Sequence, residues 1–254
     1  MANPDRNAYA RYGTVSRAGA GEIDAGLRAY MLRVYNYMAI GLALTGIAAY
    51  GAFNAAVATD PATGALGLTE FGALLYTSPL RWVVMLAPLA AVFFLSFRIE
   101  KMSVAAAQIT FWVYAGLVGL SLSSIFLVYT GQSITQVFFI TAASFGALSL
   151  FGYTTKRDLS GWGSFLFMGL IGIIIASIVN IFLASSALAF AVSVIGVLVF
   201  AGLTAYDTQQ IKEMYYASDD EATAGRKAIM GALRLYLDFI NMFIMLLQLF
   251  GDRR

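Results

Sequence analysis

Long apolar segments alternate with short polar breaks along most of this 254-residue chain. A helix that crosses a hydrocarbon core of about 30 Å needs about 20 mostly apolar residues. Several segments meet that length, and most of the connections between them are short, so neighbouring spans are expected to form antiparallel hairpins. The pattern predicts seven membrane-spanning helices, at residues 34–57, 80–98, 104–129, 134–154, 162–184, 187–210 and 228–250.

The polar segments divide the chain into a membrane domain and two tails. Residues 1–33 are polar and lack the short apolar core of a secretory signal, so a disordered or surface-lying tail is expected there. The seven-helix domain then covers 34–251, and 252–254 form a short C-terminal tail. The longest connection lies between residues 57 and 80, has X-Pro pairs near both ends, and is expected to be a loop.

The charged residues predict an orientation. Only 12% of the residues are charged, against about 25% in an average soluble domain. Lys and Arg are enriched in cytoplasmic loops near span ends. With a cytoplasmic N-terminus, twelve of the 16 basic residues lie inside, three lie outside (Arg81, Arg253 and Arg254), and Arg234 lies within the last span. With seven spans, Arg253 and Arg254 lie outside, although basic residues prefer the cytoplasmic side. A last segment that re-enters the membrane and returns would place them inside.

The chain contains neither cysteine nor histidine. Their absence excludes disulfides, thiolate metal sites, Ser-His and Cys-His catalysis, HExxH zinc sites and imidazole pH switches. Proton chemistry near neutral pH must therefore come from carboxylates in unusual surroundings. No dense basic run suggests nucleic acid as a partner. No residue is assigned a catalytic role, and the protein is not expected to be an enzyme.

Small residues recur within the predicted spans. Helices in lipid associate by close packing, which glycine and alanine permit. We expect this role for Gly41, Gly46, Gly116, Gly119, Gly163, Gly172 and Ala176.

Two acidic residues lie within predicted spans. Ionisable residues inside a membrane are rare, usually face the bundle interior and suggest a functional site. Asp207, in AYDTQQ, lies near the inner end of span six and could alternatively extend towards the inner membrane surface. Asp238, in LYLDFINMF, lies ten residues into span seven, roughly 15 Å from its start. That depth favours a functional or networked role for Asp238.

Whether the two acids meet depends on the hairpin formed by the last two spans. A midpoint near residues 222 and 223 places Asp207 and Asp238 at matched depth. Ser218 and Glu221 have the spacing of a capping box, however, and a helix that starts at 219 would place Asp238 much deeper. The residues leave both arrangements open.

A meeting of the two carboxyls would have clear chemical consequences. Two carboxylates in a desolvated site cannot both ionise cheaply, so the pair would hold one proton between them. At high pH the pair would present two negative charges to a hard divalent cation such as calcium. Neutral oxygens nearby could supplement such a site, although amides and tyrosines also bridge helices; the candidates are Tyr206, Gln209, Asn241 and Gln248.

Two long stretches, AYDTQQIKEMY at 205–215 and LYLDFINMFIMLLQLFG at 235–251, resemble the signatures of the transmembrane Bax inhibitor motif family. The resemblance implies an all-α bundle of seven transmembrane helices with the last helix central, wrapped by the other six. It also implies a pH-sensitive calcium leak controlled by an aspartate dyad. The dyad corresponds to Asp207 and Asp238, which would bind calcium transiently, with no permanently bound cofactor.

The resemblance further implies an arginine latch at the inner end of span two. In SFRIEKMS the matching residue is Arg98, with Lys101 as a poorer candidate. An acidic residue that some relatives hold within span two has no counterpart here, because residues 82–97 contain no carboxylate. The resemblance to the bacterial branch implies an integral, multi-pass protein of the bacterial inner membrane, and the basic residues predict that its N-terminus is cytoplasmic.

Three functions remain open from the sequence. The first is the calcium leak, with the lipid bilayer, calcium ions and protons as partners. The second is a non-conducting regulator of another complex, for which a membrane-bound protease is the candidate partner because bacterial relatives have been linked to one. The third is an intramembrane aspartyl protease, which also uses two aspartates on neighbouring spans. Asp238 lacks the glycine-rich context that such enzymes need, and Leu237 and Phe239 flank it instead.

Overall fold

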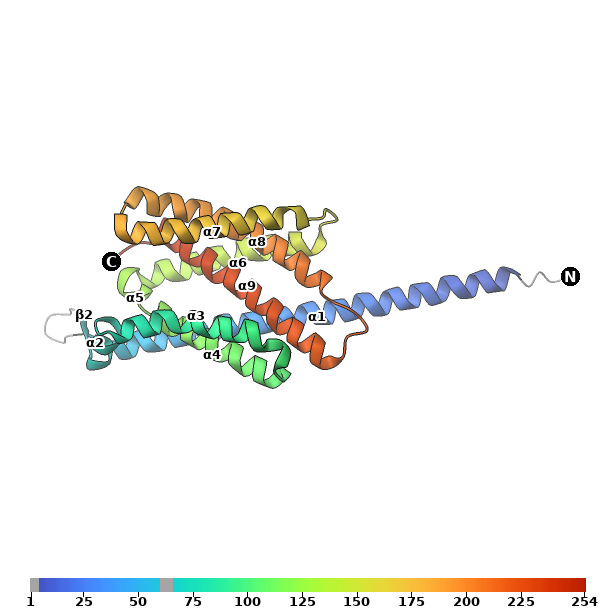
Figure 1. Ribbon diagram of the computed structural model, residues 1–254, viewed down its shortest axis with the longest axis horizontal. Helices are drawn as coiled ribbons and strands as arrows, with labels where there is room; N and C mark the ends of the chain where they lie inside the picture. The colour runs from blue at the N-terminus through green and yellow to red at the C-terminus, as the bar shows by residue number, and fades with distance from the viewer. Residues whose placement is uncertain (1–4, 60–65) are drawn as a thin grey trace.

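A computed structural model describes the backbone of residues 5–59 and 66–254, and the side chains from residue 25 onward within those ranges. The chain is predominantly helical (Figure 1). Its elements are α1 (Asp5–Ala56), β1 (Val57–Thr59), β2 (Leu66–Leu68), α2 (Glu70–Tyr76), α3 (Leu80–Arg98), the 3₁₀ turn η1 (Ile99–Lys101), α4 (Val104–Leu122), α5 (Ile125–Val128), α6 (Gly131–Thr154), α7 (Ser160–Leu183), α8 (Ser186–Glu213) and α9 (Glu221–Phe250).

Seven helical segments are long and apolar enough to cross a membrane, which confirms the predicted all-α, seven-span architecture. They cover Ala25–Ala56, Leu80–Lys101, Val104–Val128, Gly131–Thr154, Ser160–Leu183, Ser186–Glu213 and Glu221–Phe250. The first segment starts before the predicted residue 34. The polar tail predicted for 1–33 falls mostly on residues whose side chains lie outside the described set, so that boundary stays a prediction.

The connection between the first two spans contains more structure than a loop. β1 and β2 pair as a short antiparallel hairpin, with Val57 opposite Leu68. The Thr69 side chain then accepts a hydrogen bond from Gly72 N–H and caps α2, which has only seven residues. Three-residue strands and such a short helix are too brief to give a clear periodic pattern. The X-Pro pair Asp60-Pro61 lies outside the described residues.

The last helix, α9, occupies the centre of the bundle. It runs obliquely between a group formed by α6, α7 and α8 and a group formed by α1, α3 and α4 (Figure 1). In its most apolar stretch 67% of the residues are buried, against 11% in the spans of α3 and α7. Helix α9 packs directly on α1, α4, α6 and α8, whereas α3 lies mainly on α4 and α7 mainly on α8. The last helix is therefore central, with a direct shell of four helices and an outer layer of two.

Hydroxyl groups join α9 to the helices around it. Tyr236 is fully buried, and its hydroxyl lies 2.6 Å from Thr45 Oγ1 on α1. Thr45 Oγ1 also lies 2.9 Å from the carbonyl oxygen of Ala115 on α4. The Tyr236 ring packs edge-on against Phe111 and Tyr114, at centroid distances of 5.8 and 5.6 Å. One side chain thus fixes α9 against α1 and α4 through both polar and aromatic contacts.

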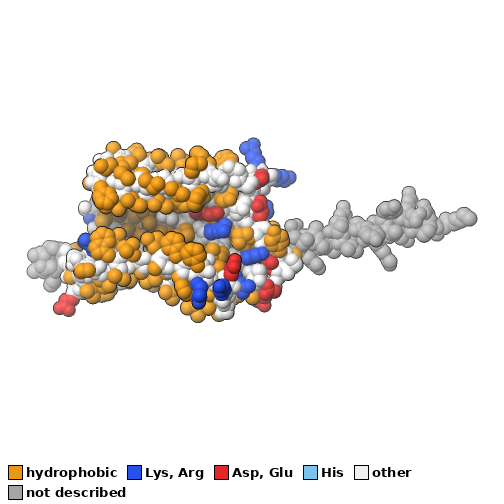
Figure 2. Space-filling view, viewed as in Figure 1, with side chains coloured by type: hydrophobic (Ala, Val, Ile, Leu, Met, Phe, Trp, Pro, Cys, Tyr) orange, Lys and Arg blue, Asp and Glu red, His pale blue; other side chains and the backbone are white. Residues whose placement is uncertain are grey.

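The surface matches a protein surrounded by lipid along its sides. Apolar side chains cover the flanks in Figure 2, and most basic and acidic side chains gather at one end of the bundle. A hollow separates α7 and α8 from α3 and α4, and charged side chains of both signs lie at one end of it (Figure 2).

Only some of the predicted packing glycines lie at close contacts. A Cβ atom at Gly119 would collide with the carbonyl oxygen of Thr45, and one at Gly41 would come within 2.9 Å of the Phe111 ring. Gly163 similarly lies against the ring of Tyr206. Gly46, Gly116 and Gly172 instead face open space. Glycine spacing in the sequence cannot distinguish these two groups, because it does not reveal which face of each helix meets a neighbour.

We predict that Gly119→Ala destabilises the bundle and that Gly116→Ala on the same helix does not. The added methyl at 119 meets the α1 backbone, which cannot move away as a side-chain tip can, so the free energy of unfolding should fall by about 1–3 kcal/mol. The methyl at 116 meets nothing within 4 Å. Thermal unfolding in detergent measures both variants, and equal melting temperatures would contradict close α1–α4 packing at Gly119.

Candidate functional site

Asp207 and Asp238 meet at the interface of the hairpin formed by α8 and α9. Helix α9 begins at Glu221, with Asp220 as its N-cap residue. This start lies two residues after residue 219, the alternative helix start that the sequence suggested. The two helices pair with a midpoint near residue 221, because Gly231 lies against Ile211 and Gly196 lies against Met245. That register leaves the two aspartates about one helical turn apart along the α8–α9 interface, near enough to influence each other.

The two carboxyl groups lie close enough for each to act electrostatically on the other. Asp238 is only 4% exposed, while Asp207 is half-buried. Within the described part of the chain, Oδ2 of Asp238 is buried and accepts no hydrogen bond from an amide, hydroxyl or cationic group. A carboxyl–carboxyl hydrogen bond requires that one partner carry a proton. Two facing carboxyl groups can share one proton between them or attract a cation in its place.

Arg234 is the cation whose field acts on both carboxyls. It lies one helical turn before Asp238 on α9, a spacing that puts two side chains on the same helix face. The Arg234 side chain is exposed, and the one ion pair within 4.0 Å among the described side chains joins Lys227 to Asp219. Arg234 thus influences the pair from nearby without a direct salt bridge. The sequence located it in the last span, and the i, i+4 spacing to Asp238 was the signal that could have linked the two.

Arg98, the predicted latch, does not contact the pair in this conformation. It is the last residue of α3, its side chain is exposed, and it takes part in no ion pair with a described side chain. Lys101, the poorer candidate, closes η1 and is also exposed and unpaired within the same set. The structure thus brings together the two acids and leaves both latch candidates apart from them.

The predicted supporting residues serve other contacts. The Tyr206 ring lies against Gly163 on α7, and the Asn241 amide donates to the backbone oxygen of Leu237, 2.8 Å away on the preceding turn. Gln209 is buried and joins α8 to the α6–α7 connection, since Oε1 accepts from Leu159 N–H at 2.7 Å and Nε2 donates to a backbone oxygen at 2.8 Å.

Gln248 contacts a different part of the protein. Its Oε1 lies 2.7 Å from Ser193 Oγ, near the opposite end of α8 from Asp207. None of the four neutral candidates therefore hydrogen-bonds to the acidic pair.

A chain of hydroxyl groups leads to the residue next to Asp207. Tyr35 on α1 lies 2.6 Å from Ser149 Oγ on α6, and Ser149 lies 2.9 Å from Thr208 Oγ1 on α8. Thr208 in turn donates to the carbonyl oxygen of Thr204 at 2.7 Å. The amino-acid sequence does not reveal these contacts, because isolated Ser, Thr and Tyr residues are common in spans and carry no spacing signal between distant helices.

The site offers two carboxylates to a cation. No group of three or more acidic side chains forms a metal cluster in the part of the chain that the structure describes. Calcium takes six to eight oxygen ligands in stable protein sites, of which this pair can supply a minority. The donor set suits a passing, largely hydrated ion better than a permanently bound one.

Comparison with known proteins identifies relatives over nearly the whole chain. A family model described as inhibitor of apoptosis-promoting Bax1 matches residues 27–254. The inner membrane protein YbhL of Escherichia coli is 49% identical, over 91% of this chain and 94% of its own. Uncharacterised proteins of Rickettsia prowazekii and Caulobacter vibrioides are 50% and 46% identical, over 91% and 99% of this chain and 92% and 99% of their own.

Proposed function

Because this chain belongs to the Bax inhibitor motif family of integral multi-pass membrane proteins, we propose that it is a pH-sensitive calcium leak channel or transporter. In this proposal Asp207 and Asp238 form the proton-sensing element of the ion pathway and bind calcium transiently. The protein is not an enzyme, and it needs no permanently bound cofactor.

The placement of the two acids is the observation that supports this proposal most strongly. A carboxylate on the central helix is costly in a membrane, and Asp238 lies there with a second acid beside it and an oxygen that no amide, hydroxyl or cation satisfies. A purely structural acid would be expected to accept hydrogen bonds from its surroundings. Protons and cations are the species that two facing carboxyls attract.

The proposed pH response follows from charge. At low pH the pair holds at least one proton and attracts cationic groups weakly. At high pH it is fully ionised and can bind a guanidinium, which keeps its charge at any accessible pH. Arg98 is our candidate for the guanidinium that closes the path, and closure would need the end of α3 to approach α8, away from its present position.

We also propose a location and an orientation. YbhL is named an inner membrane protein, and the basic residues of this chain favour a cytoplasmic N-terminus. The acidic pair would then lie in the half of the membrane nearer the cytoplasm, because Asp207 lies close to the end of α8 that joins the basic loops.

The first functional prediction concerns the acidic pair. Asp207→Asn and Asp238→Asn should each remove most of the difference in calcium flux between pH 6 and pH 8, because one amide cannot share a proton as a carboxyl does. The double variant should add little to either single change, since both residues act as one unit. Flux is measured in proteoliposomes with an enclosed calcium dye.

Glu213→Gln provides the matched control, because Glu213 is an exposed acid later on the same helix. It should leave the pH response intact. Independent, additive effects of the two aspartate substitutions would exclude a shared proton. Absence of any calcium flux through folded wild-type protein would reject the leak and favour the non-conducting regulator, with a membrane-bound protease as the partner to test.

The second prediction concerns the latch. Arg98→Ala should raise calcium leak at pH 8 more than at pH 6, because only the closed state at high pH would lose a contact. Arg81→Ala, at the opposite end of α3, is the control and should change neither rate. An unchanged leak at both pH values in folded Arg98→Ala protein would show that Arg98 only anchors the helix at the membrane border.

The third prediction concerns orientation. Gly67 lies in β2, between the first two spans, and Gly161 lies in the first turn of α7 at the opposite end of the bundle. Both are exposed, and the chain contains no cysteine of its own. Single Gly67→Cys and Gly161→Cys variants should therefore react with a membrane-impermeant thiol reagent from opposite sides. In intact spheroplasts Gly67→Cys should be labelled and Gly161→Cys protected. The reverse pattern would overturn the cytoplasmic N-terminus.

A further inference from the structure

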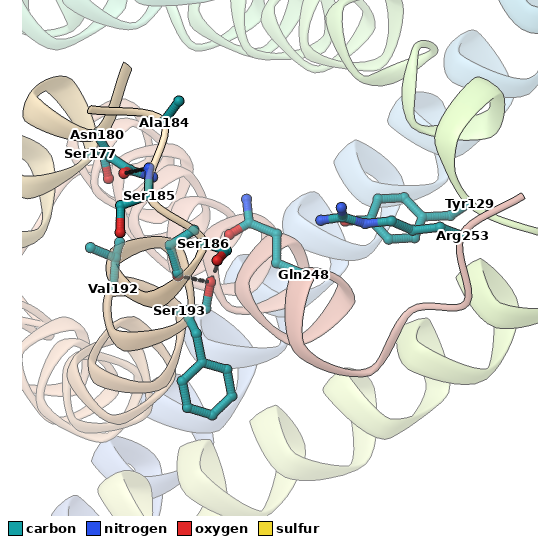
Figure 3. Close-up of a pocket in the computed structure, with 12 residues that line it drawn as sticks. Tyr129, Ser177, Asn180, Ala184, Ser185, Ser186, Val192, Ser193, Gln248 and Arg253 are labelled. Carbon is teal, nitrogen blue, oxygen red and sulfur yellow. Dashed lines mark hydrogen bonds between the residues drawn. The ribbon is translucent and has the colours of Figure 1, made fainter. Parts of the chain in front are cut away.

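A cavity of about 580 Å³, lined by both polar and apolar side chains, lies at the end of the bundle where the chain terminates, far along α9 from the acidic pair. Its walls come from the α7–α8 turn, the start of α8, the end of α9 and the C-terminal tail (Figure 3). The size falls within the range of ordinary small-ligand sites, which is about 300–1,000 Å³. None of the residues that line the cavity is acidic, and Arg253 is the one cationic residue among them.

Arg253 is held in position by the backbone of the tail. Arg253 pairs with Tyr129 as an isolated β-bridge, and the neighbouring residues add hydrogen bonds from Thr130 N–H to Asp252 O at 3.0 Å and from Arg254 N–H to Val128 O at 2.9 Å. The Arg253 guanidinium lies over the Tyr129 ring, 6.0 Å from its centroid. The backbone pairing and the ring contact restrict where the guanidinium can lie, which reduces the entropy lost on binding.

The guanidinium extends from the Tyr129 ring towards Gln248 across the cavity (Figure 3). Among the described side chains it has no carboxylate within 4.0 Å, even though Asp252 precedes it in the chain. Its five N–H donors are therefore available to a ligand. Gln248 accepts from Ser193 through its oxygen and so presents its amide N–H groups as further donors.

The opposite wall of the cavity is also ordered and polar. Ala184 adopts a left-handed conformation, with φ of 46°, at the turn between α7 and α8. Asn180 Oδ1 accepts from Ser185 N–H at 2.9 Å, and Ser185 Oγ accepts from Leu188 N–H at 3.3 Å. These bonds hold the serine-rich start of α8 in place facing the tail. Hydroxyl donors on this wall and the guanidinium on the other therefore face the same space.

We propose that this cavity binds a phosphate group, carried by an anionic phospholipid of the adjoining leaflet. A planar guanidinium with free amide and hydroxyl donors matches the several acceptor oxygens of a phosphodiester. The neighbouring surface is strongly apolar, since Phe182 is 83% exposed and Phe190 is 64% exposed. The acyl chains of a lipid whose phosphate occupies the cavity would lie along these side chains.

The test is a titration of purified full-length protein in neutral detergent with short-chain phosphatidylglycerol, followed by intrinsic fluorescence and by melting temperature. Wild-type protein should bind the lipid saturably and gain stability. Arg253→Gln should weaken binding on the order of tenfold, the loss expected for about one charge-assisted hydrogen bond. Arg254→Gln is the matched control, because it removes the same charge from the neighbouring residue. The Arg254 guanidinium lies over the Phe53 ring, so this variant should leave the affinity for the lipid unchanged.

Two further variants separate a lost contact from a disturbed tail. Arg253→Lys retains the charge without the planar fork and should bind with intermediate affinity. Gln248→Ala removes a donor without changing charge and should also weaken binding. A loss of affinity that is equal in Arg253→Gln and Arg254→Gln would show a general charge effect and overturn the site.

Two other ligands identify the source of the phosphate. A diacylglycerol of the same chain length lacks phosphate and should not bind at this site. If inorganic phosphate binds and its binding also depends on Arg253, a free anion is sufficient as the ligand. If inorganic phosphate does not bind while phosphatidylglycerol binds tightly, the cavity is a lipid site. No saturable binding of either phosphate compound would refute the proposal. These assays measure no ion flux, so their outcome does not depend on the leak.

Discussion

The need to keep the polar groups of α9 away from lipid is the constraint on which this structure depends. Asp238 lies far along a helix that is otherwise mostly apolar, and Tyr236 adds a hydroxyl two residues earlier. Either group, facing hydrocarbon, would cost several kcal/mol. The other helices surround α9, and 67% of its most apolar stretch is buried as a result. The central position of the last helix is thus a consequence of the chemistry that it carries.

The helices around α9 must associate with it and with one another. In a bilayer the hydrophobic effect does not drive this association, because lipid is as apolar as the faces of the helices. Two devices supply this. Glycines such as Gly119 and Gly152 allow backbone to meet backbone between α1 and α4 and between α6 and α8. Hydroxyl bridges, from Tyr236 to Thr45 and from Tyr35 to Ser149, then connect helices that are far apart in sequence. The bridges run towards α9 and α8, so they also fix the surroundings of the acidic pair.

The sequence predicted the spans well and the details of the site only in part. Apolar length alone identifies seven spans, because a bilayer imposes the same requirement on every helix. It could not decide whether Asp207 and Asp238 meet, because a short shift in where α9 begins changes the apparent depth of Asp238. Tyr206, Gln209 and Asn241 looked like supporting ligands because they are polar and near the acids. Helical rotation and the α6–α7 connection place them elsewhere, and a sequence without tertiary contacts does not reveal that.

The charges around Asp207 and Asp238 determine whether a proton or a divalent cation is stable between them. Arg234 lies one turn from Asp238, and its guanidinium contributes one positive charge beside the two carboxyls. With one shared proton on the pair, the three side chains sum to zero, which is the least costly state in a region of low dielectric. A divalent cation bound to the fully ionised pair would leave an excess positive charge next to that arginine. In the proposed leak, the positive charge of Arg234 would weaken the binding of calcium to the ionised pair and so favour release of the ion.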